Sequence, residues 1–149
     1  MYEIKKAEKD NFDVIRSFLL EVPAINEVDD EILKNAIILY QDSKIHGIIS
    51  YESFFNYALI RYFVFKRGVD EMIVKELFDA IEESITDNDI EYIFSLVNQN
   101  EIFDLFTSLQ FEEVNKDDVF IEEQCYQKAK FKDTRLMLKR IGLNLWLSF

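Results

Sequence analysis

The sequence has little glycine and almost no proline. Its 149 residues include three glycines and one proline: Gly47, Gly68, Gly142 and Pro23. Dinucleotide fingerprints, P-loops and the glycine-rich loops of kinases need several glycines at short fixed spacings, so the sequence excludes all three kinds of nucleotide site. A chain without a Pro/Gly-rich linker is also expected to form a single domain over residues 1–149.

Cysteine and histidine each occur once. Cys125 excludes an intramolecular disulfide and a clustered thiolate metal site. His46 excludes a site of several histidines, and any histidine-dependent triad would have to use it. We therefore expect no metal, and we interpret Cys125 as a spectator thiol and His46 as an ordinary strand residue.

Long apolar runs are missing as well. No stretch reaches the roughly 18 to 20 apolar residues of a membrane helix, and the charged segment YEIKKAEKD follows Met1. These features predict a soluble, cytoplasmic protein that does not insert in a membrane. The formal net charge of -12 disfavours nucleic acid and anionic lipid. It either favours an amine or a basic small molecule or peptide as partner, or serves only solubility.

Hydrophobic periodicity and turn residues predict an alternation of strands and helices. The expected strands are 2–6, 36–40, 45–53, 57–65, 90–97, 119–124 and 135–141. The expected helices are 10–21 capped by Asp10, a short one within 26–34 that starts at Asp29 or Asp30, one from about Asp70 to Ile85, and 101–109 capped by Asn98. Residues 41–44 are expected to join a hairpin, residues 112–118 to form a charged loop, and strands 57–65 and 90–97 to run parallel.

The stretch Tyr57 to Phe78 is the main candidate for a site, because it predicts an apolar strand, a turn around Gly68 and an amphipathic helix. The first amides of a helix lack intrahelical partners and attract anions. Asp70 and Glu71 stand in this turn. They either face the anion and repel it, or turn outward and stabilise their own helix, while the neighbouring Lys66 and Arg67 offset their charge.

Four segments of the chain form a recognisable combination: the hairpin LYQDSKIHGIISYE (39–52), the spacing from Val64 to Leu77, the segment SLVNQNEIFDLFTSLQFEEV (95–114), and the closing strand DTRLMLKRI (133–141). Together they resemble the GNAT-type N-acetyltransferase superfamily. The resemblance implies an α+β, three-layer fold: a mixed central sheet of about six or seven strands with helices on both faces.

In that family acetyl-CoA lies between the splayed fourth and fifth strands, and its pyrophosphate contacts the amides of a Gln/Arg-x-x-Gly-x-Gly/Ala loop. The resemblance places the cofactor contacts at Val64, Gly68, Val69, Met72 and Asn98. The three signature positions hold Val69, Met72 and Val74 instead, so the loop is degenerate and the chain resembles a divergent member. Glycine lets the backbone approach a phosphate closely, whereas the side chains of Met72 and Val74 are expected to add bulk beside the ligand.

The family's proton donor is also replaced. Phe106 stands where a tyrosine commonly protonates the departing thiolate. Glu52, at the end of a predicted strand, is a candidate base, directly or through a water; no catalytic residue is assigned. Two functions remain open: acyl transfer from acetyl-CoA to an amine, or a catalytically silent GNAT-fold module for binding or regulation.

The segment GLNLWLSF (142–149) forms an apolar C-terminal tail. Large apolar side chains left in water make an adhesive surface. The tail therefore predicts either a segment packed on its own domain or the contact of a homodimer.

Overall fold

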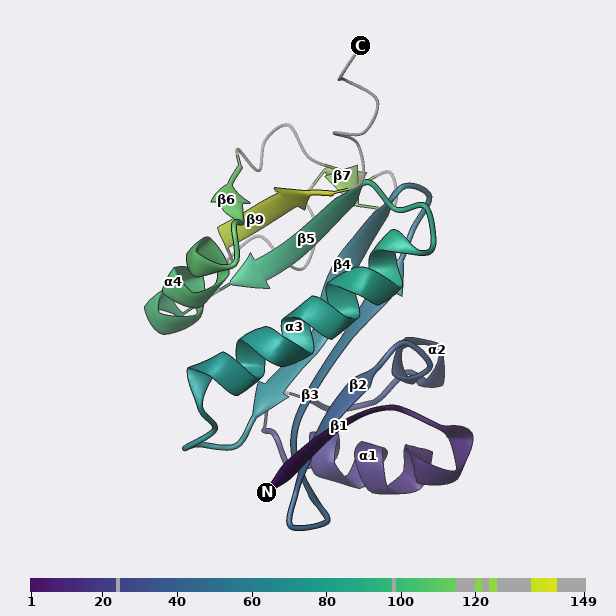
Figure 1. The fold of residues 1–149 in the computed structure, drawn as a ribbon. Helices are drawn as coiled ribbons and strands as arrows, with labels where there is room; N and C mark the ends of the chain where they lie inside the picture. The colour runs from purple at the N-terminus through teal and green to yellow at the C-terminus, as the bar shows by residue number, and fades with distance from the viewer. Residues whose placement is uncertain (24, 98, 115–119, 122–123, 126–134, 142–149) are drawn as a thin grey trace. The chain divides into compact units, whose positions relative to one another are not determined.

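A computed structural model describes residues 1–23, 25–97, 99–114, 120–121, 124–125 and 135–141 (Figure 1). Its main sheet is mixed and seven-stranded, in the order β1-β2-β3-β4-β5-β9-β6. The α+β sheet architecture predicted from the sequence is therefore confirmed. The chain divides into two compact units, residues 1–52 with 60–87 and residues 53–59 with 88–149, which we describe in turn.

The first unit holds the N-terminal strands, three α-helices and one 3-10 helix. Its elements are β1 (Tyr2–Lys6), the 3-10 helix η1 (Lys9–Asn11), α1 (Phe12–Leu20), α2 (Asp30–Leu33), β2 (Ile37–Gln41), β3 (Lys44–Ser53), β4 (Tyr57–Phe65) beyond Leu59, and α3 (Glu71–Thr86). β1 pairs antiparallel with β2, and β2 pairs antiparallel with β3. The predicted strand 57–65 matches β4 at both ends.

The β2–β3 hairpin is tighter than predicted. Gln41 pairs with Lys44, so the connection is two residues rather than four. Asp42 and Ser43 both have positive φ, 52° and 68°, as a type I′ turn requires. Neither the Asn-Gly nor the Asp-Gly pair that usually marks this turn is present. The two-residue turn was therefore not predicted from the sequence.

Helices cover both faces of the sheet in this unit, as the sequence predicted. On one face, α1 and α2 form a core with Ile38, Ile48 and Tyr62. On the other face, Ile37 and Ala80 of α3 line a common cavity; α3 crosses in front of the strands in Figure 1. Ile37 and Ile38 point to opposite faces because successive strand side chains alternate.

The first two helices begin differently from one another. The side chain of Asp29, one of the two predicted starts, accepts a 2.9 Å hydrogen bond from the Glu31 amide and caps α2. The prediction that Asp10 caps a helix over 10–21 is wrong. Asp10 lies inside η1, and Asn11 occupies the N-cap of α1 without a side-chain cap bond. A turn of 3-10 helix, common at helix ends, takes the place of the cap.

The second unit holds the C-terminal elements. They are the start of β4, β5 (Tyr92–Val97), α4 (Asn100–Ser108), β6 (Glu112–Glu113), β7 (Phe120–Ile121), β8 (Gln124–Cys125) and β9 (Arg135–Arg140). β4 and β5 are parallel, as predicted, over three residue pairs from Tyr57↔Tyr92 to Leu59↔Phe94. β9 pairs antiparallel with both β5 and β6.

Several predictions for this unit are corrected. The expected loop 112–118 contains β6, which the pairing with β9 forms. The expected strand 119–124 is replaced by β7 and β8, which pair with each other in a separate two-stranded sheet. α4 has Gln99 at its N-cap with no side-chain cap bond; Asn98, the predicted cap, and the tail 142–149 lie outside the described residues. Among the helices that the structure does describe, none is long and apolar enough to span a bilayer.

Gly47 of β3 leaves room for the ring of Phe65 on β4. A Cβ placed on Gly47 would lie 2.3 Å from Cδ1 of Phe65, far inside van der Waals contact. The Lys66 amide donates a 2.9 Å hydrogen bond to the His46 carbonyl beside this contact. This hydrogen bond holds β3 and the end of β4 together at the point where the Phe65 ring occupies the space that a side chain at position 47 would fill.

We expect Gly47→Ala to lower the free energy of unfolding by about 1–3 kcal/mol, because the Phe65 ring must move. Urea denaturation would measure this loss. In a Phe65→Leu background the same substitution should cost much less, since the smaller side chain relieves the contact. An equal cost in both backgrounds would show that the ring is not the obstacle.

Candidate functional site

The loop between β4 and α3 is built around a left-handed glycine. Gly68 has φ +90°, a conformation that glycine adopts without the strain of a Cβ. The Lys66 amide anchors the start of the loop on β3, and the Val69 amide donates a long 3.4 Å hydrogen bond to the Lys66 carbonyl. No atom lies within 4 Å of a Cβ placed on Gly68. The outer side of the loop is therefore open.

Asp70 caps α3 with its own carboxylate. Its Oδ1 accepts a 2.8 Å hydrogen bond from the Met72 amide, and its carbonyl accepts bonds from the Ile73 and Val74 amides. Glu71 extends along the helix surface, 3.8 Å from the Lys75 ammonium. The Asp70 carboxylate thus occupies an amide that an anion at this helix end would use.

The predicted cofactor contacts on this loop are neighbours in space. Gly68 is exposed, Val69 is half-buried, and the Met72 side chain is 76% exposed. Val64 on β4 instead packs against the core made with α1 and α2. Asn98 lies outside the described residues. Three of the five predicted positions therefore form one short, accessible segment.

Val74 does not belong to the loop surface. It is 7% exposed and lies on the buried side of α3 together with Leu77. The interpretation that its side chain adds bulk beside a ligand is therefore wrong. Successive helical residues are rotated by about 100°, which turns residue 74 inward when residue 72 faces outward.

The loop carries charges of both signs. Lys66 and Arg67 are exposed, and within the described ranges neither forms an ion pair. Asp70 and Glu71 follow directly, but each carboxylate already has a partner on α3. The two cations are therefore available to a ligand, whereas the two acids are engaged with the helix.

Glu52, the candidate base, is bound to a cation. The Arg61 guanidinium donates a 3.0 Å hydrogen bond to its Oε1, and both side chains are about one-third exposed, 34% for Arg61 and 31% for Glu52. Glu52 remains partly accessible, but its Oε1 already holds the Arg61 guanidinium. His46 is a strand residue whose Nδ1 lies 3.1 Å from the Lys44 carbonyl oxygen.

Phe106, at the position of the expected proton donor, is a core residue of the second unit. Its side chain is 1% exposed, and its ring contacts Phe111 edge to face with centroids 4.9 Å apart. A buried phenyl ring has no proton to donate. This position therefore contributes packing and no acid chemistry.

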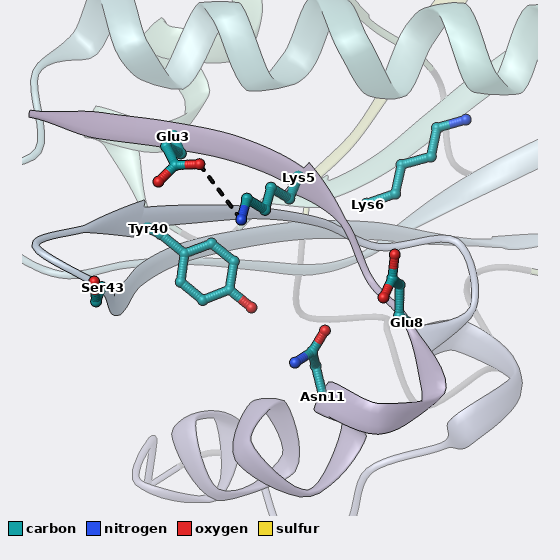
Figure 2. Close-up of a pocket in the computed structure, with 7 residues that line it drawn as sticks. All are labelled: Glu3, Lys5, Lys6, Glu8, Asn11, Tyr40 and Ser43. Carbon is teal, nitrogen blue, oxygen red and sulfur yellow. Dashed lines mark ion pairs between the residues drawn. The ribbon is translucent and has the colours of Figure 1, made fainter.

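The first unit also contains two open cavities near β1. The larger, of about 550 Å³, is lined by Glu3, Lys5, Lys6, Glu8, Asn11, Tyr40 and Ser43 (Figure 2). The smaller, of about 280 Å³, lies between β1, β2 and α3. In the larger cavity Lys5 already pairs with Glu3 at 3.4 Å. Neither cavity is lined by the predicted loop residues, and neither offers a constellation for catalysis.

Over the residues that the structure describes, no three His, Cys, Asp or Glu side chains are grouped so that they could hold an ion.

Solved structures share this fold. An acetyltransferase of the GNAT family from Staphylococcus aureus Mu50 has a TM-score of 0.72 at 15% identity, over 95% of this chain and 100% of that chain. The ribosomal-protein-S18-alanine N-acetyltransferase from Escherichia coli has a TM-score of 0.67 at 12% identity, over 98% and 99%. This chain has the fold of the GNAT acetyltransferases. No family model matches its sequence, and no curated protein matches it either.

A third GNAT-fold structure was solved with coenzyme A. N-acetylglutamate synthase from Neisseria gonorrhoeae, complexed with coenzyme A and N-acetyl-glutamate, has a TM-score of 0.72 at 13% identity over 95% of this chain. The match covers 35% of the synthase, so this chain spans about a third of that protein's length. The similarity establishes the GNAT fold only. Any activity must be argued from the residues at the site.

We expect Asp70→Ala to destabilise the protein by about 0.5–2 kcal/mol, because the Met72 amide loses its cap. Asp70→Asn should remain close to wild type, since asparagine caps equally well. Asp79→Ala, an exposed position in the middle of α3, is the matched control and should change stability by less than about 0.5 kcal/mol. Urea denaturation of the three variants distinguishes a cap from a general effect of lost charge.

Phe106→Tyr should lower the free energy of unfolding by about 1–3 kcal/mol, because the added hydroxyl would be buried without a partner. Phe103→Tyr on the same helix is the control, since that ring is half-buried and its hydroxyl can reach water. Thermal or urea unfolding measures both. Equal stability of the two variants would mean that position 106 has room and a partner for a phenol.

Proposed function

We propose that this protein binds acetyl-CoA at the loop between β4 and α3 and transfers the acetyl group to an amine. The observation that carries the proposal is the open loop at Gly68, followed directly by the N-terminus of a 16-residue helix, in a chain with the GNAT fold. Such a helix end provides amides and a positive dipole for phosphate. The coenzyme A complex of a GNAT-fold neighbour supports the same ligand.

The residues of the loop fit a pyrophosphate, although one of the first amides of α3 is already occupied. That amide belongs to Met72 and is bonded to Asp70. No hydrogen-bond partner is found among the described residues for the amides of Gly68 and Glu71, and Lys66 and Arg67 can neutralise phosphate charge. The proposed site therefore binds through backbone amides and two cations, without the glycines of the family's loop.

Acetyl-CoA, when bound, supplies an acetyl group activated as a thioester, which an amine can attack to form an amide and release the thiol. The attacking amine must first lose a proton, and Glu52 or a water beside it is the proposed acceptor. Phe106 provides no acid. Because a thiol has a pKa of about 8.5, its thiolate departs without strong assistance.

A general acid typically contributes about 10²–10⁴ in rate. Without one, the proposed transfer proceeds but loses part of this factor, because the thiolate departs unprotonated. The net charge of -12 favours an amine or a basic peptide as the acceptor, since it attracts cations. A nucleic acid or an anionic membrane is disfavoured by the same field.

Calorimetric titration with acetyl-CoA tests the proposal. We expect binding by the wild type and about five-fold tighter binding by Asp70→Asn, because an exposed charge about 6 Å from a phosphate opposes binding by about 1 kcal/mol. Asparagine keeps the cap, so the comparison isolates charge. Asp79→Asn, which removes the same charge farther along α3, should bind as the wild type does.

Absence of heat and of thermal stabilisation in both the wild type and Asp70→Asn would reject acetyl-CoA binding. The catalytically silent binding module would then be the better description. Binding without tightening in Asp70→Asn would show instead that the phosphates lie away from this carboxylate.

A further inference from the structure

The turn between β3 and β4 presents a phenylalanine to solvent. Phe55 is 98% exposed. On either side of it, Phe54 and Tyr57 stack with ring centroids 4.8 Å apart, and Tyr57 meets Phe94 of β5 edge to face at 5.3 Å. We call these four residues, all in the second unit, the aromatic turn. A single exposed apolar side chain is ordinary, but this one lies in a short turn between two half-buried, stacked rings. The turn therefore offers apolar surface to a further segment.

The chain leaves β9 next to this turn. The Glu91 amide donates a 2.9 Å hydrogen bond to the Asn56 carbonyl, and the Ile141 amide donates a 2.7 Å hydrogen bond to the Glu91 carbonyl. Glu91 therefore connects the aromatic turn to the last described residue through two backbone bonds. Ile141 is 8% exposed, so this end of β9 is well anchored.

The segment that follows Ile141 has the composition of an apolar ligand. Five of its eight residues, 142–149, are large and apolar: Leu143, Leu145, Trp146, Leu147 and Phe149. Eight residues span up to about 26–29 Å when extended, and only two backbone hydrogen bonds separate Ile141 from Asn56, the neighbour of Phe55. The segment contains no charged residue that would oppose burial.

We propose that residues 142–149 dock on the aromatic turn of their own chain. A tethered segment meets a neighbouring surface at a high effective concentration, in the millimolar range for short flexible links. Docking in the same chain is therefore favoured over capture of the segment from a second copy. The contact removes Phe55 and the apolar side chains of the segment from water together.

Trp146 is the only tryptophan of the chain, so its fluorescence reports on the segment without labelling. In the wild-type protein we expect emission at short wavelength, and a shift to longer wavelength with stronger acrylamide quenching in Phe55→Ser. Phe55→Leu keeps an apolar contact and should emit as the wild type does. Val14→Ser, at a 60% exposed position of α1 in the other unit, is the matched control and should cause no shift.

Dilution and size-exclusion chromatography with light scattering identify the occupant. A monomeric mass and emission independent of concentration support docking within one chain. A dimer whose emission shifts to longer wavelength on dilution would overturn the proposal in favour of exchange between two copies. Unchanged emission in Phe55→Ser would overturn the aromatic turn as the docking surface. None of these readouts depends on acetyl-CoA.

Discussion

Burial of one side of α3 is the constraint on which the candidate site depends. Leu77, Phe78, Ile81 and Ile85 are all 0% exposed, and full burial of such a side chain contributes about 1.5–3 kcal/mol. This fixes the rotation of the helix about its axis. With that rotation set, Val74 faces the core and Met72 faces solvent, and the first turn presents Asp70 at the open end of the loop.

The elements predicted well are those whose signals are local. The apolar run of β4 and the periodic apolar residues of α3 were enough to predict where these two elements begin and end. Gly68, Val69 and Met72 lie in one short segment because they are close in sequence. β6 was missed because two charged residues become a strand only through pairing with β9, more than twenty residues later. Val74 was assigned to the loop surface because alignment to a motif ignores the rotation of a helix, and the Asp70 cap was only one of two alternatives in the sequence.

Asp70 shows how a helix end can be used in two exclusive ways. The Met72 amide has one hydrogen to donate, and the Asp70 carboxylate holds it at 2.8 Å. A cap of this kind contributes about 0.5–2 kcal/mol to the stability of the fold, whereas the dipole of an exposed helix end contributes about 0.3–1 kcal/mol to an anion. The aspartate therefore secures the helix at the expense of one phosphate contact, and a ligand here must rely on the remaining amides and on Lys66 and Arg67.

The net acidity of the whole chain does not determine whether an anion can bind at the loop between β4 and α3. A net charge of -12 repels anions at long range, but the Debye length at physiological ionic strength is about 8 Å. Within that distance the local charges dominate, and two exposed cations precede two acids that are already engaged with α3. The global field thus slows the approach of any anionic ligand, while the charges of the loop itself determine how strongly such a ligand would be held.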